Sequence, residues 1–310
     1  MIWPAPLRRG DTILLVASSR RVEPAELRPF LEFARIQNWK IEYDPNTLYA
    51  KEGLLAGSDT QRLSVLQQAL DDPKAKAIWF ARGGYGSSRI WPLLSWEGFR
   101  AHPKWLIGFS DTTPFLWGAA KIGVVALHAP VAAYIPYRTS IQAVNQLLAL
   151  LRGEENYYTL TWSYRPWLAW RVGKAEGKLL GGNLTLLQSL CGTTLDLKLW
   201  REPILLFWEE VGEYFYRLDR MSWHLRNAGW YDQSTGVMIG SLTLMREDED
   251  FPFGRSADAI VRESVGKNIP LVMGMPIGHT QENYPVPVGA WAELEVREEG
   301  ARLSLTRGTK

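Results

Sequence analysis

Residues 105–109 (WLIGF) form a continuous apolar run of strand length, and they lead directly into Ser110, Asp111 and Thr112. Apolar and polar residues do not alternate in this run, so we expect a strand that is buried on both faces. A helix is expected to begin at Asp111 or Thr112. A buried strand followed by a sharp turn and a helix is typical of an open α/β domain with a parallel sheet.

The rest of the first half repeats this alternation of buried strands and amphipathic helices. Residues 24–37 have the helical spacing of apolar positions, and Ser58 with Gln61 forms a capping box at the start of a second helix. Further strands are expected at residues 12–17, 40–43, 77–80 and 124–127. We therefore expect residues 1–152 to form a domain whose parallel sheet is covered on both faces.

The pattern changes in the second half of the chain. Residues 153–172 are rich in Tyr, Trp and Thr and lack helical periodicity, which predicts a linker. Residues 173–310 contain short runs bounded by turns, and one long helix is expected at residues 216–228, before a C-cap at Gly229. The short runs lie at residues 175–180, 204–208, 236–239, 271–273 and 292–296. They indicate a smaller, mixed and β-rich second domain with a curved sheet.

Composition and charge argue against several classes of protein. The net charge is only +2 and no run of Lys or Arg occurs, which argues against nucleic-acid binding. Cys191 is the only cysteine, so no internal disulfide can form, and this fits a reducing compartment. The first residues lack the pattern of a signal peptide, and three prolines with Lys121 make residues 113–137 a poor membrane-spanning helix. We expect a cytoplasmic protein that binds neither nucleic acid nor membrane.

Ser110 is a candidate nucleophile because a sharp strand-to-helix turn exposes a serine hydroxyl above the sheet. The N–H groups at the start of the following helix can bind a developing oxyanion. The alternative is that Ser110 only caps the helix, a common role for serine at such a position. The segment also differs from the G-x-S-x-G pattern of esterases, because Thr112 replaces the second glycine.

A glycine-rich turn, residues 81–86 (ARGGYG), follows the predicted strand at 77–80. Because the carboxyl ends of parallel strands meet at one edge, this turn and Ser110 are expected to converge. The turn lacks the lysine of a P-loop and the G-x-G-x-x-G spacing. Its adjacent glycines, Gly83 and Gly84, are better suited to bringing backbone N–H groups close to a substrate carbonyl.

A serine nucleophile needs a base, and the chain contains four histidines. His102 in a polar loop and His224 on a helix are expected to be solvated or to pack. His128 ends a predicted strand, where a site role and a structural role are equally compatible with the pattern. His279 lies in a loop just after the predicted strand at 271–273, and loops at strand ends often carry catalytic groups.

The base in turn needs a carboxylate to orient it. Glu209 and Glu210 follow the apolar run at residues 204–208, and an acidic pair at the end of a buried strand is costly unless it has partners. The alternative is a solvated surface pair without a function. In chain order the candidates are Ser110, Glu209 or Glu210, and His279, and each follows a predicted strand.

A metal or cofactor site is not indicated by the sequence. The chain has no His-Glu-x-x-His motif and no paired Cys/His spacing, so we expect no metal and no cofactor. Cys191 is better explained as a small buried residue than as a nucleophile.

Seven segments resemble, in chain order, the motifs of one enzyme family. They are LRRGD (7–11), LAGSDTQR (55–62), ARGGYG (81–86), IGFSDTT (107–113), GGNL (181–184), WEE with YRLDR (208–220), and GH with VPVG (278–289). The family is the LD-carboxypeptidases of peptidase family S66, which includes muramoyltetrapeptide carboxypeptidases and microcin C self-immunity hydrolases. Mild departures occur at Ala17 and Ala129, where the family has proline and glycine.

The resemblance implies Ser110 as the nucleophile, His279 as the base, and Glu209 rather than Glu210 as the orienting acid. It also implies a flavodoxin-like first domain, a second domain that carries Glu209 and His279, and a homodimer. The fold class is therefore α/β, with a flavodoxin-like parallel sheet and a smaller mixed, swivelling or barrel-like C-terminal domain.

The reaction that the resemblance implies is hydrolysis of the amide bond before the terminal D-Ala of a murein tetrapeptide. Backbone N–H groups of Asp111 and of Gly83 or Gly84 would stabilise the oxyanion. Arg82 is a candidate partner for a substrate carboxylate, with a structural salt bridge as the alternative. A hydrolase of microcin-like peptidyl adenylates with the same three residues, and a muropeptide-binding module without activity, are the competing functions.

Overall fold

The computed structural model describes the chain except for residues 155–156, 164, 166–167, 169, 267 and 307–310. The chain divides into two compact units. The first contains Met1–Asn156 and Gln281–Gly289, and the second contains Tyr157–Thr280 and Ala290–Lys310. Within the described ranges, no helix combines the length and the apolar character needed to cross a membrane.

The first unit is built on a six-stranded sheet in the order β12-β5-β4-β3-β1-β2. Five strands are parallel, and β12 pairs antiparallel with β5 at the edge. The parallel part has the order 2-1-3-4-5 of flavodoxin-like folds, so the expected fold class is confirmed. The strands are β1 (Thr12–Val16), β2 (Lys40–Glu42), β3 (Ala77–Phe80), β4 (Trp105–Gly108), β5 (Ala126–His128) and β12 (Val286–Val288).

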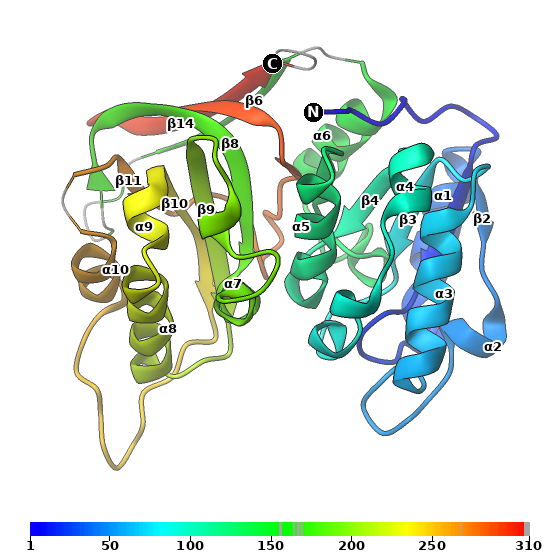
Figure 1. The fold of residues 1–310 in the computed structure, drawn as a ribbon, viewed down its shortest axis with the longest axis horizontal. Coiled ribbons are helices and arrows are strands. Elements are labelled where there is room, and N and C mark those ends of the chain that lie inside the picture. Colours follow the sequence, from blue (N-terminus) through cyan, green and yellow to red (C-terminus); the bar gives the residue numbers. More distant parts are fainter. Residues whose placement is uncertain (155–156, 164, 166–167, 169, 267, 307–310) are drawn as a thin grey trace. The chain divides into compact units, whose positions relative to one another are not determined.

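The helices of the first unit follow from the expected sequence signals. Ser58 Oγ accepts a hydrogen bond from Gln61 N at 3.2 Å and Gln61 Oε1 accepts one from Ser58 N at 2.9 Å, which confirms the capping box. Every residue of β3 and β4 is buried, as the unbroken apolar runs predict. The helices are α1 (Pro24–Ile36), α2 (Pro45–Leu48), α3 (Asp59–Asp71), α4 (Glu97–Ala101), α5 (Thr113–Lys121) and α6 (Ile141–Arg152) (Figure 1).

The second unit contains an eight-stranded mixed sheet in the order β6-β14-β13-β8-β9-β10-β11-β7. The pairs from β8 to β11 are parallel and the outer pairs are antiparallel. The strands are β6 (Tyr157–Ser163), β7 (Trp170–Arg171), β8 (Gly173–Asn183), β9 (Ile204–Val211), β10 (Ser234–Thr243), β11 (Leu271–Met273), β13 (Trp291–Val296) and β14 (Gly300–Thr306).

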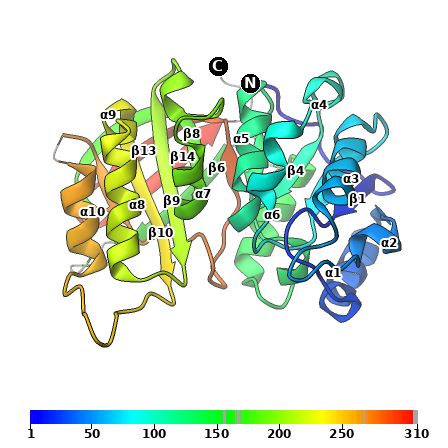
Figure 2. The ribbon, with the colours of Figure 1, turned by 60° about the horizontal axis from the view of Figure 1, so that its bottom comes forward.

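Helices pack on one face of this second sheet, where α8 and α10 run side by side (Figures 1 and 2). The long helix expected at 216–228 is α8, and Gly229 follows it with φ +77°, in the left-handed region expected of a C-cap glycine. The helices are α7 (Leu184–Leu190), α8 (Phe215–Asn227), α9 (Trp230–Gln233) and α10 (Ala257–Val265). Five short 3-10 turns among the described residues complete the two units: Ser87–Arg89, Trp91–Leu93, Ser110–Thr112, Ala132–Tyr134 and Leu197–Leu199.

Two segments lie differently from the division into 1–152, 153–172 and 173–310. Residues 157–163, expected in a linker, form β6, because their Tyr, Thr and Trp residues favour a strand and pair with β14. Residues 281–289 return to the first unit, where β12 pairs with β5 and forms the edge of the sheet, a position that tolerates Pro287. Other parts of the expected linker, residues 155–156, 164, 166–167 and 169, lie outside the described residues.

Candidate active site

Ser110 occupies the turn between β4 and α5, as the sequence predicts. Its φ is +63°, in the left-handed region that non-glycine residues rarely adopt, and such strain is characteristic of nucleophile turns. Thr112 Oγ1 donates to Phe109 O at 3.0 Å and Thr113 Oγ1 donates to Ser110 O at 2.7 Å, so the turn is held from both sides. The N-cap residue of α5 is Thr112, which argues against a simple capping role for Ser110.

The glycine-rich turn after β3 lies against Ser110. A Cβ atom on Gly83 would lie 3.0 Å from Ser110 Cβ and 3.2 Å from Ser110 Oγ, so Gly83 lies beside the serine side chain with no room for a side chain of its own. Gly84 has φ +115°, and a Cβ there would lie 2.6 Å from the Cβ of Arg20. The expected convergence of the two strand ends therefore occurs, with Gly83 on the Ser110 side.

Asp111 is almost fully buried and links the Ser110 turn to the glycine-rich turn. Its Oδ2 accepts a hydrogen bond from Ser87 N at 2.9 Å. Burial raises the pKa of Asp111, and hydrogen bonds from Ser19 and Ser87 oppose that rise. The carboxylate thus holds the backbone of the two turns together, a role that the sequence did not indicate.

Arg82, the candidate ligand for a substrate carboxylate, forms an ion pair with Glu26 of α1. Both side chains are partly buried. This contact corresponds to the structural alternative, because the pair ties the glycine-rich turn to α1.

In the second unit, the structure brings Glu209 and His279 together. Glu209 Oε2 lies 2.7 Å from His279 Nδ1, and the Glu209 side chain is completely buried. A proton on Nδ1 that is donated to a carboxylate leaves the basic lone pair on Nε2, as a general base requires. Burial lowers the pKa of His279. The charge and the hydrogen bond of Glu209, together with the charge of Glu210, have a larger opposite effect, so the pKa is raised above its ordinary value of 6.5.

Glu210 has a different set of partners, although it adjoins Glu209 on the same strand. Its oxygens accept hydrogen bonds from Val211 N, Thr185 N and Thr185 Oγ1, each at 2.8 Å, and from Asn183 Nδ2 at 3.0 Å. Burial and the charge of Glu209 raise its pKa. Both glutamates lie inside β9 rather than after it, because the strand continues to Val211.

The loop that carries His279 is fastened to the neighbouring strand β10. Met275 N donates to Ile239 O, and Ser241 N donates to Ile277 O, each at 3.0 Å. Gly278 has φ +107°, and a Cβ there would lie 2.8 Å from Glu209 Oε2 and 2.4 Å from Ser241 Oγ. Only glycine lets the loop approach the buried carboxylate this closely.

Sequence reasoning missed Asn183, Thr185 and Ser241 as parts of this site. Asn183 Nδ2 also contacts Glu209 Oε1 at 3.3 Å, so it bridges the two glutamates. The GGNL segment, which contains Asn183, was a detectable signal, but its partners follow only from the parallel pairing of β8 with β9.

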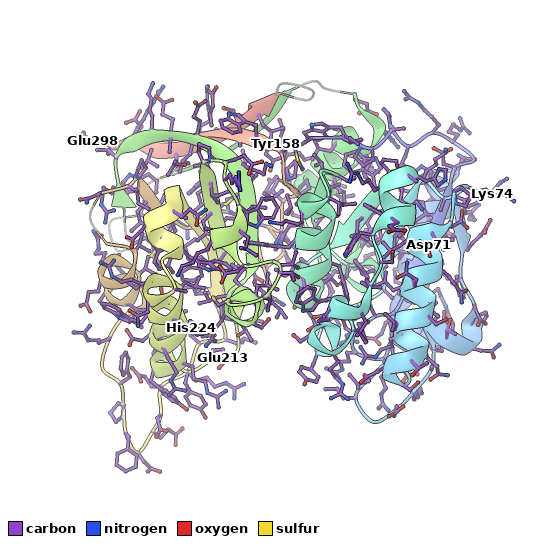
Figure 3. All side chains as sticks on the ribbon, in the orientation of Figure 1. Asp71, Lys74, Tyr158, Glu213, His224 and Glu298 are labelled. Carbon is purple, nitrogen blue, oxygen red and sulfur yellow. The ribbon has the colours of Figure 1, made fainter. Side chains whose placement is uncertain are left out.

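The remaining candidates lie elsewhere. His128 is fully buried at the end of β5, and its ring lies 5.8 Å from the ring of Phe109. His102 is exposed, and so is His224 on α8, where Figure 3 labels it. Burial raises the pKa of Cys191 to about 12, which disfavours a thiolate nucleophile. Among the residues that the structure describes, no group of three or more His, Cys, Asp or Glu could hold a metal ion.

Comparisons with known proteins show which family the chain belongs to. The LD-carboxypeptidase N-terminal domain profile matches residues 13–129, and the LD-carboxypeptidase C-terminal domain profile matches residues 176–294. A putative carboxypeptidase of Synechocystis is 32% identical over 95% of this chain and 94% of its own length. A murein tetrapeptide carboxypeptidase of Pseudomonas aeruginosa is 33% identical over 79% of this chain and 81% of its own length.

A solved structure has the same fold. It is the microcin C7 self-immunity protein in complex with aspartyl sulfamoyl adenosine, which superposes with a TM-score of 0.85 at 23% identity over 99% of both chains. The two profiles together cover most of the chain, and the relatives match nearly its full length. The chain therefore belongs to the LD-carboxypeptidase family, and it is a carboxypeptidase of the serine hydrolase type.

Proposed function

We propose that this enzyme cleaves the L,D amide bond before the terminal D-Ala of murein tetrapeptides, with Ser110, Glu209 and His279 as a catalytic triad. The observation that carries the proposal is the 2.7 Å contact between His279 Nδ1 and the fully buried Glu209 Oε2. A carboxylate of this kind orients the imidazole and stabilises its charged form. The murein tetrapeptide carboxypeptidase among the relatives supports the substrate class.

The proposed reaction is acyl transfer in two steps. His279 Nε2 takes the proton of Ser110 as Oγ attacks the amide carbonyl, and the protonated imidazole then gives that proton to the leaving D-Ala amine. Water, activated by the same imidazole, hydrolyses the acyl-enzyme and releases the tripeptide. Backbone N–H groups of Asp111 and of Gly83 or Gly84 stabilise the oxyanion, at about 3 kcal/mol for each donor.

The proposal requires Ser110 and His279 to meet, although they belong to different units. The chain path supports this requirement, because the segment Gln281–Gly289 returns to the first unit just after His279. Its strand β12 pairs with β5, and β5 pairs with β4, which leads to Ser110. The proposal also includes a role in peptidoglycan recycling, a cytoplasmic location and a homodimer.

The test is mass spectrometry of products from a panel of murein tripeptides, tetrapeptides and pentapeptides. We expect the tetrapeptide to yield a tripeptide and free D-Ala, and the Ser110→Ala variant to yield neither. The exposed Ser64 on α3 provides a matched Ser→Ala control that should keep full activity. Full activity of Ser110→Ala, or loss of activity in EDTA, would contradict the proposed mechanism.

A second candidate function is the hydrolysis of peptidyl adenylates of the microcin type with the same triad. It is favoured by the shared fold of the microcin C7 self-immunity protein, whose solved complex contains aspartyl sulfamoyl adenosine. Comparing kcat/KM for a murein tetrapeptide and for a peptidyl sulfamoyl adenylate separates the two. We expect kcat/KM to be larger for the tetrapeptide than for the peptidyl sulfamoyl adenylate.

A further inference from the structure

A carboxypeptidase acts next to a free terminal carboxylate, so it needs a group that recognises this anion. Arginine is well suited to this task, because its planar guanidinium donates two parallel hydrogen bonds to a carboxylate. The turns around Ser110 contain several arginines, and their contacts distinguish them.

Four of these arginines have partners within the protein. Arg82 pairs with Glu26, and Arg89 pairs with Asp59. The remaining two also have partners, because buried Arg62 donates to Ser18 O and Gly86 O and the Arg138 guanidinium lies 5.5 Å from the centre of the Tyr134 ring. The contacts of Arg82, Arg89 and Arg62 tie separate segments of the first unit together. The Arg138 contact lies within one loop.

Arg20 differs from these four arginines. Its side chain is exposed, and within the described part of the chain its guanidinium makes no hydrogen bond or ion pair. Its backbone N donates to Gly83 O at 3.3 Å, and its Cβ, Cγ and Cδ lie within 3.5 Å of the place where a Gly84 Cβ would be. The side chain of Arg20 therefore crosses Gly84, while the adjacent Gly83 lies beside the Ser110 side chain.

This placement runs the stem of an uncompensated cationic side chain past Gly84, the residue next to Gly83, which lies beside the nucleophile. Neighbouring residues of a chain are about 3.8 Å apart, which is also the length of the single residue that separates a scissile amide from a terminal carboxylate. The glycine at position 84 fits this arrangement, because any side chain there would displace Arg20.

We propose that Arg20, rather than Arg82, binds the terminal carboxylate of the peptide substrate. The inference rests on the proposed function and specifies how that site selects a free C-terminus. Arg20 thus acts as a specificity residue. A peptide with a neutral C-terminus has no carboxylate for Arg20 to bind, so Arg20 does not increase its rate of hydrolysis.

The experiment compares two tetrapeptides, one ending in D-Ala and one ending in D-Ala amide, in a double-mutant cycle between enzyme and substrate. Arg20→Gln should lower kcat/KM for the free acid by about 10- to 100-fold, the value of a charged hydrogen bond, and should leave that for the amide nearly unchanged. Arg20→Lys keeps the charge but not the paired donors, so it should recover part of the loss. The neighbouring Arg21 is also exposed, and Arg21→Gln is the matched control.

Each outcome is decisive. Equal losses for acid and amide in Arg20→Gln, or an equal effect of Arg21→Gln, would overturn the assignment of Arg20 and leave the proposed function intact. Failure of the wild-type enzyme to release D-Ala from the free acid would instead overturn the proposed function, and the role of Arg20 with it. A loss confined to the free acid and to Arg20 supports the inference.

Discussion

The Ser110 turn and the Glu209–His279 pair are held in place by different physical means. Ser110 is fixed by backbone geometry: its φ is +63°, Thr112 and Thr113 brace the turn, and Gly83 lies against the side chain. The Glu209–His279 pair is fixed by buried polar contacts, in which Glu209 is completely buried and bonded to His279 and Asn183.

The difference indicates how each region should fail. A turn held by shape is sensitive to added volume, because a small shift of a nucleophile misaligns the attack. A buried polar pair is sensitive to changes in charge and hydrogen bonding, because groups left without partners in a low dielectric are costly. Substitutions that change only volume, or only charge, therefore separate the two regions.

The largest effect is expected for Glu209→Gln, which preserves the volume and removes the charge. Without the carboxylate, His279 loses its preferred tautomer and the stabilisation of its charged form, so kcat should fall by about 10⁴-fold. The measurement is steady-state D-Ala release, with circular dichroism to verify folding. A loss of less than tenfold would show that Glu209 does not serve the base.

A matched pair of Gly→Ala substitutions comes next. Gly83→Ala would bring a Cβ to 3.2 Å from Ser110 Oγ, so it should lower kcat/KM by about 10²-fold. It should leave the thermal midpoint nearly unchanged, because the strain falls on the Ser110 side chain. Gly278→Ala, at φ +107° and 2.4 Å from Ser241 Oγ, should reduce both activity and the thermal midpoint. A large drop in the thermal midpoint of Gly83→Ala would contradict the view that the Ser110 turn and the Glu209–His279 pair are held by different means.

Much of this arrangement was predictable from the sequence. The unbroken apolar runs predicted the parallel sheet, and the apolar strands before Ser110 and His279 predicted that both residues lie in turns or loops at strand ends. The strands β6 and β14 were missed, since β6 alone has no partner nearby in sequence and depends on pairing with β14, far along the chain. For the same reason Asn183 and Ser241 could not be assigned, because their roles arise from neighbouring strands rather than from local motifs.

The pH dependence tests the electrostatic region directly. A general base must be neutral, and the pKa of His279 is raised by Glu209, so the acid limb of kcat/KM should lie above pH 6.5. Below that limb, the rate should fall about tenfold per pH unit. In Glu209→Gln, where burial acts without the opposing charge, an NMR titration of His279 should show a lower pKa. An unchanged His279 pKa would mean that Glu209 does not set it.

The same shift affects stability with a defined sign. A histidine whose pKa is raised by folding stabilises the folded state fully below its unfolded pKa of about 6.5. This contribution is lost as the pH rises through the higher folded pKa. The difference in unfolding free energy between the wild type and His279→Gln, measured in urea titrations, should therefore be largest below pH 6.5. It should shrink as the pH rises through the folded pKa, by about 1.4 kcal/mol for each unit by which folding raises that pKa.

The smallest effect on activity is expected for Glu210→Gln, the partner experiment to Glu209→Gln. Glu210 accepts hydrogen bonds from Asn183, Thr185 and Val211 but does not contact His279 in any described hydrogen bond. The new amide NH₂ would face donors, so the variant should lose about 1–3 kcal/mol of unfolding free energy in urea titrations. Its kcat should stay within about tenfold of the wild type, because Glu209 remains to orient His279. If Glu210→Gln instead lost as much activity as Glu209→Gln, the two adjacent carboxylates would act as one unit, and the assignment of Glu209 alone would be wrong.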